Sequence, residues 1–246
     1  MTKLSVNVNK IATLRNTRNN GIPDLVRLSG IALAAGAHGI TVHPRPDQRH
    51  IRFEDVGQLA ALVAQHPGAE YNIEGNPFHG LIEHCERARP AQATLVPDAR
   101  EAFTSNHGWN LVELGKTERT ALARAIESLH ACGCRVSLFV DPVAGIMALA
   151  RELGADRVEL YTEPYATAIA DGRQEAALLL YAQAARAAVD CGLGVNAGHD
   201  LSLTNLGAFV RFVGLVDEVS IGHALIADAL ELGLAEAVRR YRALCA

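Results

Sequence analysis

The sequence predicts an α/β protein, a parallel (β/α)8 TIM barrel with extra short helices, formed by residues 1–246 as a single domain. Three observations predict this fold. Eight short segments rich in β-branched residues alternate with helical patterns along the chain. The length of 246 residues is close to the ~250 typical of one such barrel. No linker or change of composition divides the sequence.

A doubly wound open sheet is the structural alternative, because it uses the same alternation of strands and helices. Its dinucleotide-binding form has a glycine-rich turn that follows a strand and opens a helix. The stretch Gly192-Leu193-Gly194 instead precedes an expected strand, so it does not favour the open sheet.

The expected strands are short and apolar, and several are followed at once by a polar residue or a proline. In the second strand, Ile40, Thr41 and Val42 are β-branched, and Pro44 cannot continue a central strand. The eight strands are expected at residues 4–8, 39–42, 70–74, 93–96, 135–140, 157–161, 193–196 and 218–221.

Helical periodicity lies between the strands and usually ends near a glycine. Helices are expected at residues 25–35, 54–65, 78–87, 117–130, 174–190, 202–213, 224–230 and 235–244, with one that ends at residue 154 and a short extra one at 165–170. Residues 13–21 are polar and are expected to form a loop. The longest connection, 98–115, is a candidate lid.

The composition argues against several classes of partner. The net charge is −4, with acids and bases mixed and few aromatic residues, so we expect no nucleic acid partner. No apolar run reaches the ~18 residues of a membrane span, and the N-terminus lacks a signal-peptide core. The five cysteines, an odd number, are typical of reduced thiols, so we expect a cytoplasmic protein without a membrane partner.

Closure of the barrel would bring the C-terminal ends of all strands to one face. The residues expected there are polar or titratable: Asn7, Asn9, His43, Glu74, Thr104, Asp141, Glu159, His199 and His223. Each also has a structural explanation, such as a cap for Asn9 and Asp141 or an arginine pair for Glu159, but together they predict an active site on this face.

Two carboxyl groups have positions suited to acid–base chemistry. Glu159 lies inside an apolar run, so it should point into the barrel with a raised pKa unless a cation pairs with it. Glu74 and His43 end neighbouring strands, where they could supply a base and an acid near neutral pH.

Two turns indicate phosphate binding. Residues 220–224 lead from the last strand into a short helix, a frequent phosphate site in barrels. Backbone N–H groups at Gly222 and His223 would hold the anion with the helix dipole, and residues 198–200 could supply the other half. Additional cationic groups are Arg18, Arg45 and His50.

Over almost its whole length the sequence resembles the pyridoxine 5′-phosphate synthase family. The matching motifs, in order, are Asn7-Val8-Asn9-Lys10-Ile11-Ala12-Thr13-Leu14-Arg15-Asn16-Thr17-Arg18, Gly39-Ile40-Thr41-Val42-His43-Pro44-Arg45, Asn72-Ile73-Glu74, Val158-Glu159-Leu160-Tyr161-Thr162, Val195-Asn196-Ala197-Gly198-His199 and Ile221-Gly222-His223-Ala224.

The resemblance implies a β/α barrel that assembles as a homo-octamer. It also implies that 3-amino-2-oxopropyl phosphate condenses with 1-deoxy-D-xylulose 5-phosphate to give pyridoxine 5′-phosphate, phosphate and water. These steps call for acid–base groups. We therefore expect small phosphorylated substrates as partners, with no cofactor and no metal.

The resemblance further implies roles for single residues. His43 and Glu74 would be general bases, His199 a general acid, and Glu159 would stabilise the transition state. The implied binding residues are Asn7 and Arg18 for the aminoketone phosphate, Asn9, Lys10, Arg45, His50 and Thr104 for the sugar phosphate, and Asp200, Gly222 and His223 for the phosphate-binding turns.

The chain departs from the family pattern at two places. Many members carry Asp-His where this chain has Asn9-Lys10, and a glycine commonly follows the acid histidine where this chain has Asp200. Asn9 keeps the hydrogen-bonding shape without the charge, and Lys10 keeps a donor but cannot act as a neutral imidazole. The Asp200 carboxylate adds negative charge near an expected phosphate.

Three other interpretations are possible. A class I aldolase-type barrel needs a Schiff-base lysine, and only Lys10 of the three lysines lies at a strand end. A metal-dependent barrel would use as ligands His43, Glu74, His199 and His223, although no paired histidines have metal-ligand spacing. A non-catalytic phosphosugar-binding protein would not need both Glu74 and Glu159.

Overall fold

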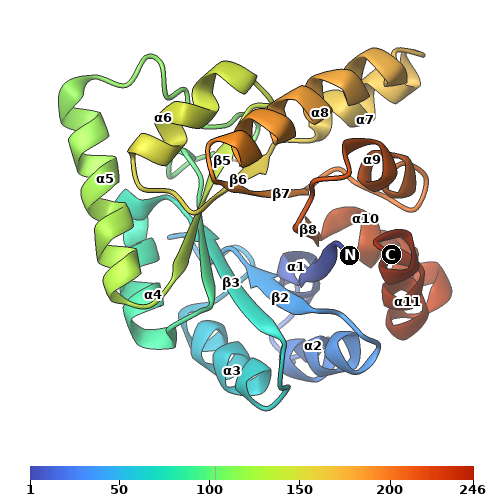
Figure 1. Cartoon of the computed structure of the whole chain (residues 1–246). Coiled ribbons are helices and arrows are strands. Elements are labelled where there is room, and N and C mark those ends of the chain that lie inside the picture. The colour runs from blue at the N-terminus through green and yellow to red at the C-terminus, as the bar shows by residue number, and fades with distance from the viewer. Residues whose placement is uncertain (103) are drawn as a thin grey trace.

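The computed structural model describes residues 1–102 and 104–246, and its centre is a closed barrel of parallel strands (Figure 1). The strands pair in sequence order, and β8 closes the barrel by pairing with β1. Their bounds are β1 Lys3–Asn7, β2 Gly39–Val42, β3 Glu70–Gly75, β4 Gln92–Leu95, β5 Arg135–Val140, β6 Arg157–Leu160, β7 Gly194–Gly198 and β8 Glu218–Ile221. The predicted barrel is confirmed, and the open sheet is excluded.

Helices cover the outside of this barrel (Figure 1). They are α1 Asn9–Asn16, α2 Leu25–Ala34, α3 Phe53–Ala64, α4 Ile82–Ala88, α5 Lys116–Ala131, α6 Met147–Glu152, α7 Glu163–Ala170, α8 Gln174–Asp190, α9 Leu206–Val213, α10 His223–Leu232 and α11 Leu234–Leu244, with short π and 3-10 turns at Pro77–Leu81 and Ala144–Ile146. The predicted extra helix is α7. Among the described residues, no helix has the length and apolar character needed to cross a membrane.

The prediction of a loop at 13–21 was wrong for residues 13–16, which belong to α1. Arg15 lies on the buried side of this helix, and its guanidinium donates to both carboxylate oxygens of Asp55, at 2.6 and 2.8 Å. It also donates to the carbonyl of His50 at 3.1 Å. This buried ion pair lets a polar sequence form a packed helix, and it ties α1 to α3 and to the segment that carries His50.

Most other predicted boundaries agree within a few residues, but α9 begins later than expected. The backbone N–H of Ser202 donates to the side chain of Asn205 at 2.7 Å. This local hydrogen bond forms a turn, so the regular helix starts only at Leu206.

Side chains of the barrel strands alternate between apolar residues outside and polar residues inside. The outward residues pack beneath the helices and form the core: Leu4, Val6, Ile40, Val42, Ile73, Leu95, Val136, Leu138, Val158, Leu160, Val195, Val219 and Ile221. Inside the barrel, Ser5 bonds Thr41 at 2.7 Å, and Thr94 donates to Asn72 at 3.1 Å. Apart from Phe139 on β5, the barrel interior is therefore a polar space enclosed by an apolar shell.

At the N-terminal end of the barrel, charged and amide groups satisfy one another. Glu70 pairs with both Lys3 and Arg135. Burial raises the pKa of Glu70, but these two cations outweigh it and hold the pKa at about 2. Gln92 donates to Glu218 at 3.3 Å. This paired layer forms a closed floor, so the opening of the barrel lies at the opposite end.

The long connection 98–115 is fixed to the barrel near its C-terminal part. The indole Nε1 of Trp109 donates to the carbonyl of Leu95 at 3.0 Å. A Cβ at Gly108 would lie 2.3 Å from a backbone atom of β5, so only glycine allows this close approach. Residue 103 of this predicted lid lies outside the described residues.

Candidate active site

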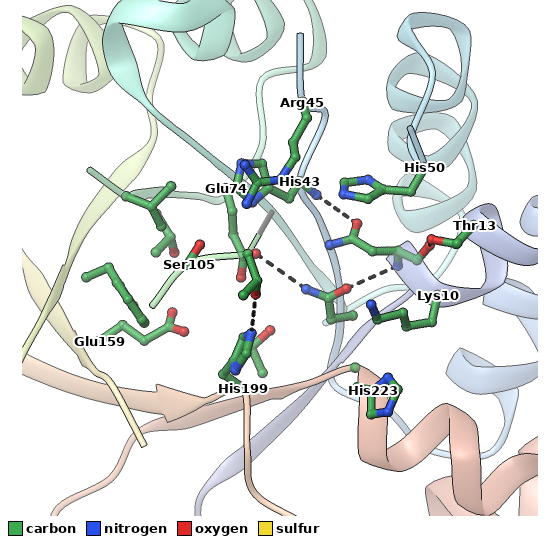
Figure 2. A pocket seen from close by; sticks show the side chains of 18 of the residues that line it. Lys10, Thr13, His43, Arg45, His50, Glu74, Ser105, Glu159, His199 and His223 are labelled. Atoms are coloured by element: carbon green, nitrogen blue, oxygen red, sulfur yellow. Dashed lines mark hydrogen bonds between the residues drawn. The ribbon is translucent and has the colours of Figure 1, made fainter. Parts of the chain in front are cut away.

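A cavity of about 540 Å³ opens at the carboxyl ends of the strands. Figure 2 shows the side chains that surround it. The predicted site residues that line it are Asn7, Asn9, Lys10, His43, Arg45, His50, Glu74, Thr104, Glu159, His199, Asp200, Gly222 and His223. Two predicted residues are not among the lining residues: Arg18, which is exposed beyond the end of α1, and Asp141, whose carboxylate accepts from the backbone N–H of Gly108 at 3.2 Å.

Other lining residues were not singled out from the sequence: Thr13, Arg49, Thr94, Val96, Ser105, Phe139 and Ser220. Thr94, Phe139 and Ser220 occupy inward positions of their strands, so the strand period of two could have identified them. Thr13 was missed because α1 was not expected. Ser105 belongs to the long connection, where the sequence pattern does not predict which side chains face the barrel.

Two asparagine side chains arrange the ends of the first three strands. Asn7 accepts from the backbone N–H of Asn9 at 3.1 Å and donates to Glu74 at 3.4 Å. Asn9 in turn accepts from the backbone N–H of His43 at 3.0 Å. A Cβ at Gly222 would lie 3.1 Å from Asn7, so glycine leaves room for this arrangement. The amides thus fix Glu74 and His43 in register at the cavity.

The two carboxyl groups predicted for acid–base chemistry are both perturbed. Burial raises the pKa of Glu74 to about 7, even though His199 and Arg45 oppose the shift. Glu159 is buried, and its Oε2 has no hydrogen-bond partner among the described residues. Burial and the neighbouring Glu74 and Glu218 raise the pKa of Glu159 well above its ordinary value. This agrees with the sequence prediction that Glu159 points into the barrel and has a raised pKa unless a cation pairs with it.

Two imidazoles on the β2 side stay neutral at physiological pH. Burial lowers the pKa of His43 well below its usual range, and the neighbouring Arg45, His50 and Arg49 lower it further. Burial, Arg45 and Arg49 likewise lower the pKa of His50 to about 4. His50 Nδ1 accepts from the backbone N–H of Ile51 at 2.9 Å, so its proton resides on Nε2. Each neutral ring offers one donor and one acceptor nitrogen.

His199 differs from these two imidazoles. Burial would lower its pKa, but the carboxylates of Asp200 and Glu74 outweigh burial, and its pKa is raised. Its Nδ1 lies 2.7 Å from the Asp200 carboxylate, and its Nε2 lies 3.3 Å from the hydroxyl of Thr104. The cavity therefore combines an imidazole with a raised pKa, neutral imidazoles and carboxyl groups with raised pKa values.

The start of the long connection is clamped over the cavity by charge. Asp98 accepts from Arg45 at 2.5 Å and from the hydroxyl of Ser105 at 2.7 Å. Arg45 and Arg49 both donate to the carbonyl of Ala102, each at 3.1 Å. These bonds hold the connection next to β2, which places Thr104 and Ser105 at the cavity.

The predicted phosphate turns lie side by side. A Cβ at Gly198 would be 2.2 Å from the carbonyl oxygen of Ser220, so the β7 and β8 turns approach too closely for any side chain there. Helix α10 begins at His223 directly after Gly222. The first backbone N–H groups of a helix lack partners within it and favour anions. Both turns line the same cavity as the acid–base groups.

Fold and site together define a class of protein: a barrel enzyme with acid–base groups beside anion-binding elements. Residues 4–246 match the family described as pyridoxal phosphate biosynthesis protein PdxJ. A pyridoxine 5′-phosphate synthase of Albidiferax ferrireducens is 54% identical over 245 residues, which cover 98% of this chain and 96% of that protein. One from Xanthomonas oryzae pv. oryzae is 55% identical over 247 residues, with 98% and 95% covered.

The chain therefore belongs to the pyridoxine 5′-phosphate synthase family, as the sequence motifs predicted, and it is an enzyme of this type in pyridoxine biosynthesis. Solved structures of low identity share the barrel fold. A tryptophan synthase from M. tuberculosis superposes with a TM-score of 0.66 at 11% identity, with 99% of this chain and 92% of that chain covered. A thiamine phosphate pyrophosphorylase from Pyrococcus furiosus gives 0.61 at 14%, with 99% and 95% covered.

The raised pKa of Glu74 predicts a titration that nuclear magnetic resonance can measure in the free protein. The side-chain carboxyl carbon of Glu74, assigned by its loss in Glu74→Gln, should titrate with a midpoint at about 7. The folded state holds this proton to higher pH than the unfolded state. Wild-type stability should therefore fall more steeply than that of Glu74→Gln as pH rises from the ordinary carboxyl range to about 7. A midpoint in the ordinary glutamate range would contradict the burial account.

Proposed function

We propose that the chain condenses 3-amino-2-oxopropyl phosphate with 1-deoxy-D-xylulose 5-phosphate by general acid–base catalysis. The products are pyridoxine 5′-phosphate, phosphate and water. The observation that carries the proposal is the pair of Glu74 and His199, which line one cavity and whose pKa values are both raised, that of Glu74 to about 7. A carboxylate base with a pKa of about 7 and an imidazole whose surroundings favour its proton suit a condensation with loss of water.

Each acid–base group has a role that follows from its surroundings. Glu74 takes a proton from carbon or nitrogen, and neutral His43 serves as the second base. His199 gives its proton to the oxygen that leaves as water. Burial and neighbouring carboxyl groups favour the protonated form of Glu159, and in that form it donates a hydrogen bond where negative charge develops on oxygen.

The anion-binding elements suit two phosphorylated substrates. The sugar phosphate is bound on the β1–β2 side by Asn9, Lys10, Arg45, His50 and Thr104. The aminoketone phosphate contacts Asn7 and the turns at Asp200, Gly222 and His223, while Arg18 would have to approach from outside the cavity of its own chain. Arg45 already pairs with Asp98, so its contact with a phosphate requires an exchange of partners.

We also propose that the enzyme works as a homo-octamer in the cytoplasm. Exposed apolar side chains on the outer helices, such as Leu180, Phe212 and Leu230, supply surface that association would bury. The five cysteines are free thiols, as a reducing compartment favours. Light scattering of the purified chain should give an octameric mass, and a monomer at working concentration would contradict the assembly.

The direct test of the proposed reaction uses the purified protein with both substrates. Pyridoxine 5′-phosphate and inorganic phosphate should appear together, and neither should form when one substrate is omitted. Binding of both substrates without product would favour the phosphosugar-binding alternative and overturn the proposal.

Replacement of the proposed base gives a second prediction. Glu74→Gln keeps the shape of the side chain but cannot take a proton, so turnover should fall by about 10²–10⁴-fold with the fold intact. Glu152→Gln, on the exposed side of α6, is the matched control and should keep normal turnover. Near-normal turnover of folded Glu74→Gln would remove Glu74 from the role of base.

Lys10 gives a third prediction because its ammonium lines the cavity and carries charge suited to a phosphate. Lys10→Met should raise the KM for 1-deoxy-D-xylulose 5-phosphate far more than it lowers kcat, because it removes uniform binding. Lys10→His should restore much of the affinity. Loss of turnover at saturating substrate in Lys10→Met, together with borohydride labelling of Lys10 in the wild type, would instead favour the aldolase-type covalent mechanism.

A further inference from the structure

The turn that carries His199 has a backbone conformation that side chains rarely adopt. His199 has a φ of 53°, in the left-handed region. Its backbone N–H donates to the carbonyl of Ser220 on β8 at 3.1 Å. The next N–H, that of Asp200, donates to the hydroxyl of Thr162 after β6 at 3.3 Å. Both neighbouring strands thus hold the turn in place, as expected where an unfavourable conformation serves a function.

Within this turn, the two ring nitrogens of His199 have different partners. Asp200 Oδ2 lies 2.7 Å from Nδ1, and the hydroxyl of Thr104 lies 3.3 Å from Nε2. A carboxylate can only accept a hydrogen bond, so the Nδ1 proton points to Asp200. Nε2 is therefore the nitrogen that faces the cavity.

The Asp200 carboxylate is itself anchored through its backbone. The side chain of Asn205 donates to the carbonyl of Asp200 at 3.2 Å and accepts from Ser202 at 2.7 Å. The carbonyl of Asn205 accepts from the buried hydroxyl of Tyr165 at 3.1 Å. This chain of bonds connects the turn to α7 and limits how far the carboxylate can move from the imidazole.

The charged and titratable groups around His199 come from several elements. Lys10 on α1 opposes protonation of the imidazole, whereas Glu74 on β3 and Asp200 favour it. The ring of Tyr161, which follows β6, lies 6.4 Å from the imidazole between centroids and has its pKa raised by burial to about 12, so it stays neutral. The carboxylate in contact with Nδ1 is therefore the local group that offsets the Lys10 ammonium.

We propose that Asp200 is a positioning residue that holds Nδ1 of His199 and keeps Nε2 directed at the substrate as the proton donor. The proposal rests on the proposed acid role of His199. In this arrangement the Asp200 carboxylate contacts the His199 imidazole, and the surrounding turns contact the substrate phosphate. A carboxylate beside a phosphate would repel it. A carboxylate that accepts a hydrogen bond from an imidazole instead orients that ring as a general acid.

The test compares Asp200→Asn with Asp171→Asn, a matched control that removes an exposed carboxylate paired with Arg173 outside the cavity. The first measurement is nitrogen-15 resonance of the free proteins, with the His199 signals assigned by their loss in His199→Gln. In Asp200→Asn the midpoint of His199 should fall by about one pH unit or more, and Nδ1 should lose preference for the proton. Asp171→Asn should leave both unchanged.

The second measurement is kinetic and separates positioning from substrate binding. In Asp200→Asn the alkaline limb of the pH profile of kcat/KM should move to lower pH, together with the titration midpoint of His199. The kcat should fall at least about tenfold, while the KM of each substrate should change less than about twofold. Asp200→Glu should recover part of the wild-type profile.

Two results would overturn the proposal: a His199 titration in Asp200→Asn identical to the wild type, or a raised KM with an unmoved alkaline limb. If the wild type makes no pyridoxine 5′-phosphate at all, the proposed function fails. The resonance measurement then still decides whether Asp200 positions His199.

Discussion

The structure depends on one constraint: a closed parallel barrel whose strands turn their apolar side chains outward and their polar side chains inward. Buried polar groups are costly unless they are paired. At the N-terminal end they pair with one another, as Glu70 does with Lys3 and Arg135. Further along the barrel the pairing is incomplete, and Ser137, Glu159 and Ser220 each keep a buried oxygen without a partner among the described residues. Of these, Glu159 and Ser220 line the cavity.

The electrostatics of the site follow from the same constraint. Carboxyl groups gathered inside the barrel lose water and repel one another, so Glu74 and Glu159 hold their protons to higher pH than usual. The imidazoles of His43 and His50, near Arg45, have lowered pKa values and lose their protons at lower pH than usual, because burial and cationic neighbours disfavour the charged ring. His199 departs from that pattern because its turn brings Asp200 against Nδ1. The pKa shifts of these groups are thus set by their positions within one cavity.

The sequence predicted the barrel, its strands and most of the cavity because these rest on local patterns. β-branched runs mark strands, and barrel closure brings their ends together without further information. The helix α1 was missed because its stability depends on the pairing of Arg15 with Asp55, a contact between distant parts of the chain. The clamp of Asp98 on Arg45 was missed for the same reason. The contact of Asp200 with His199 joins neighbouring residues, and it was missed because the sequence pattern does not predict the left-handed conformation of His199.

The central claim is that burial in the barrel mouth makes Glu74 a base at neutral pH. The pH dependence of kcat/KM, which reports groups of the free enzyme, tests this claim most directly. An acid limb with a midpoint at about 7 is expected, because the Glu74 carboxyl must lose its proton before it can act. An acid limb in the ordinary carboxyl range, or a profile without such a limb, would contradict it.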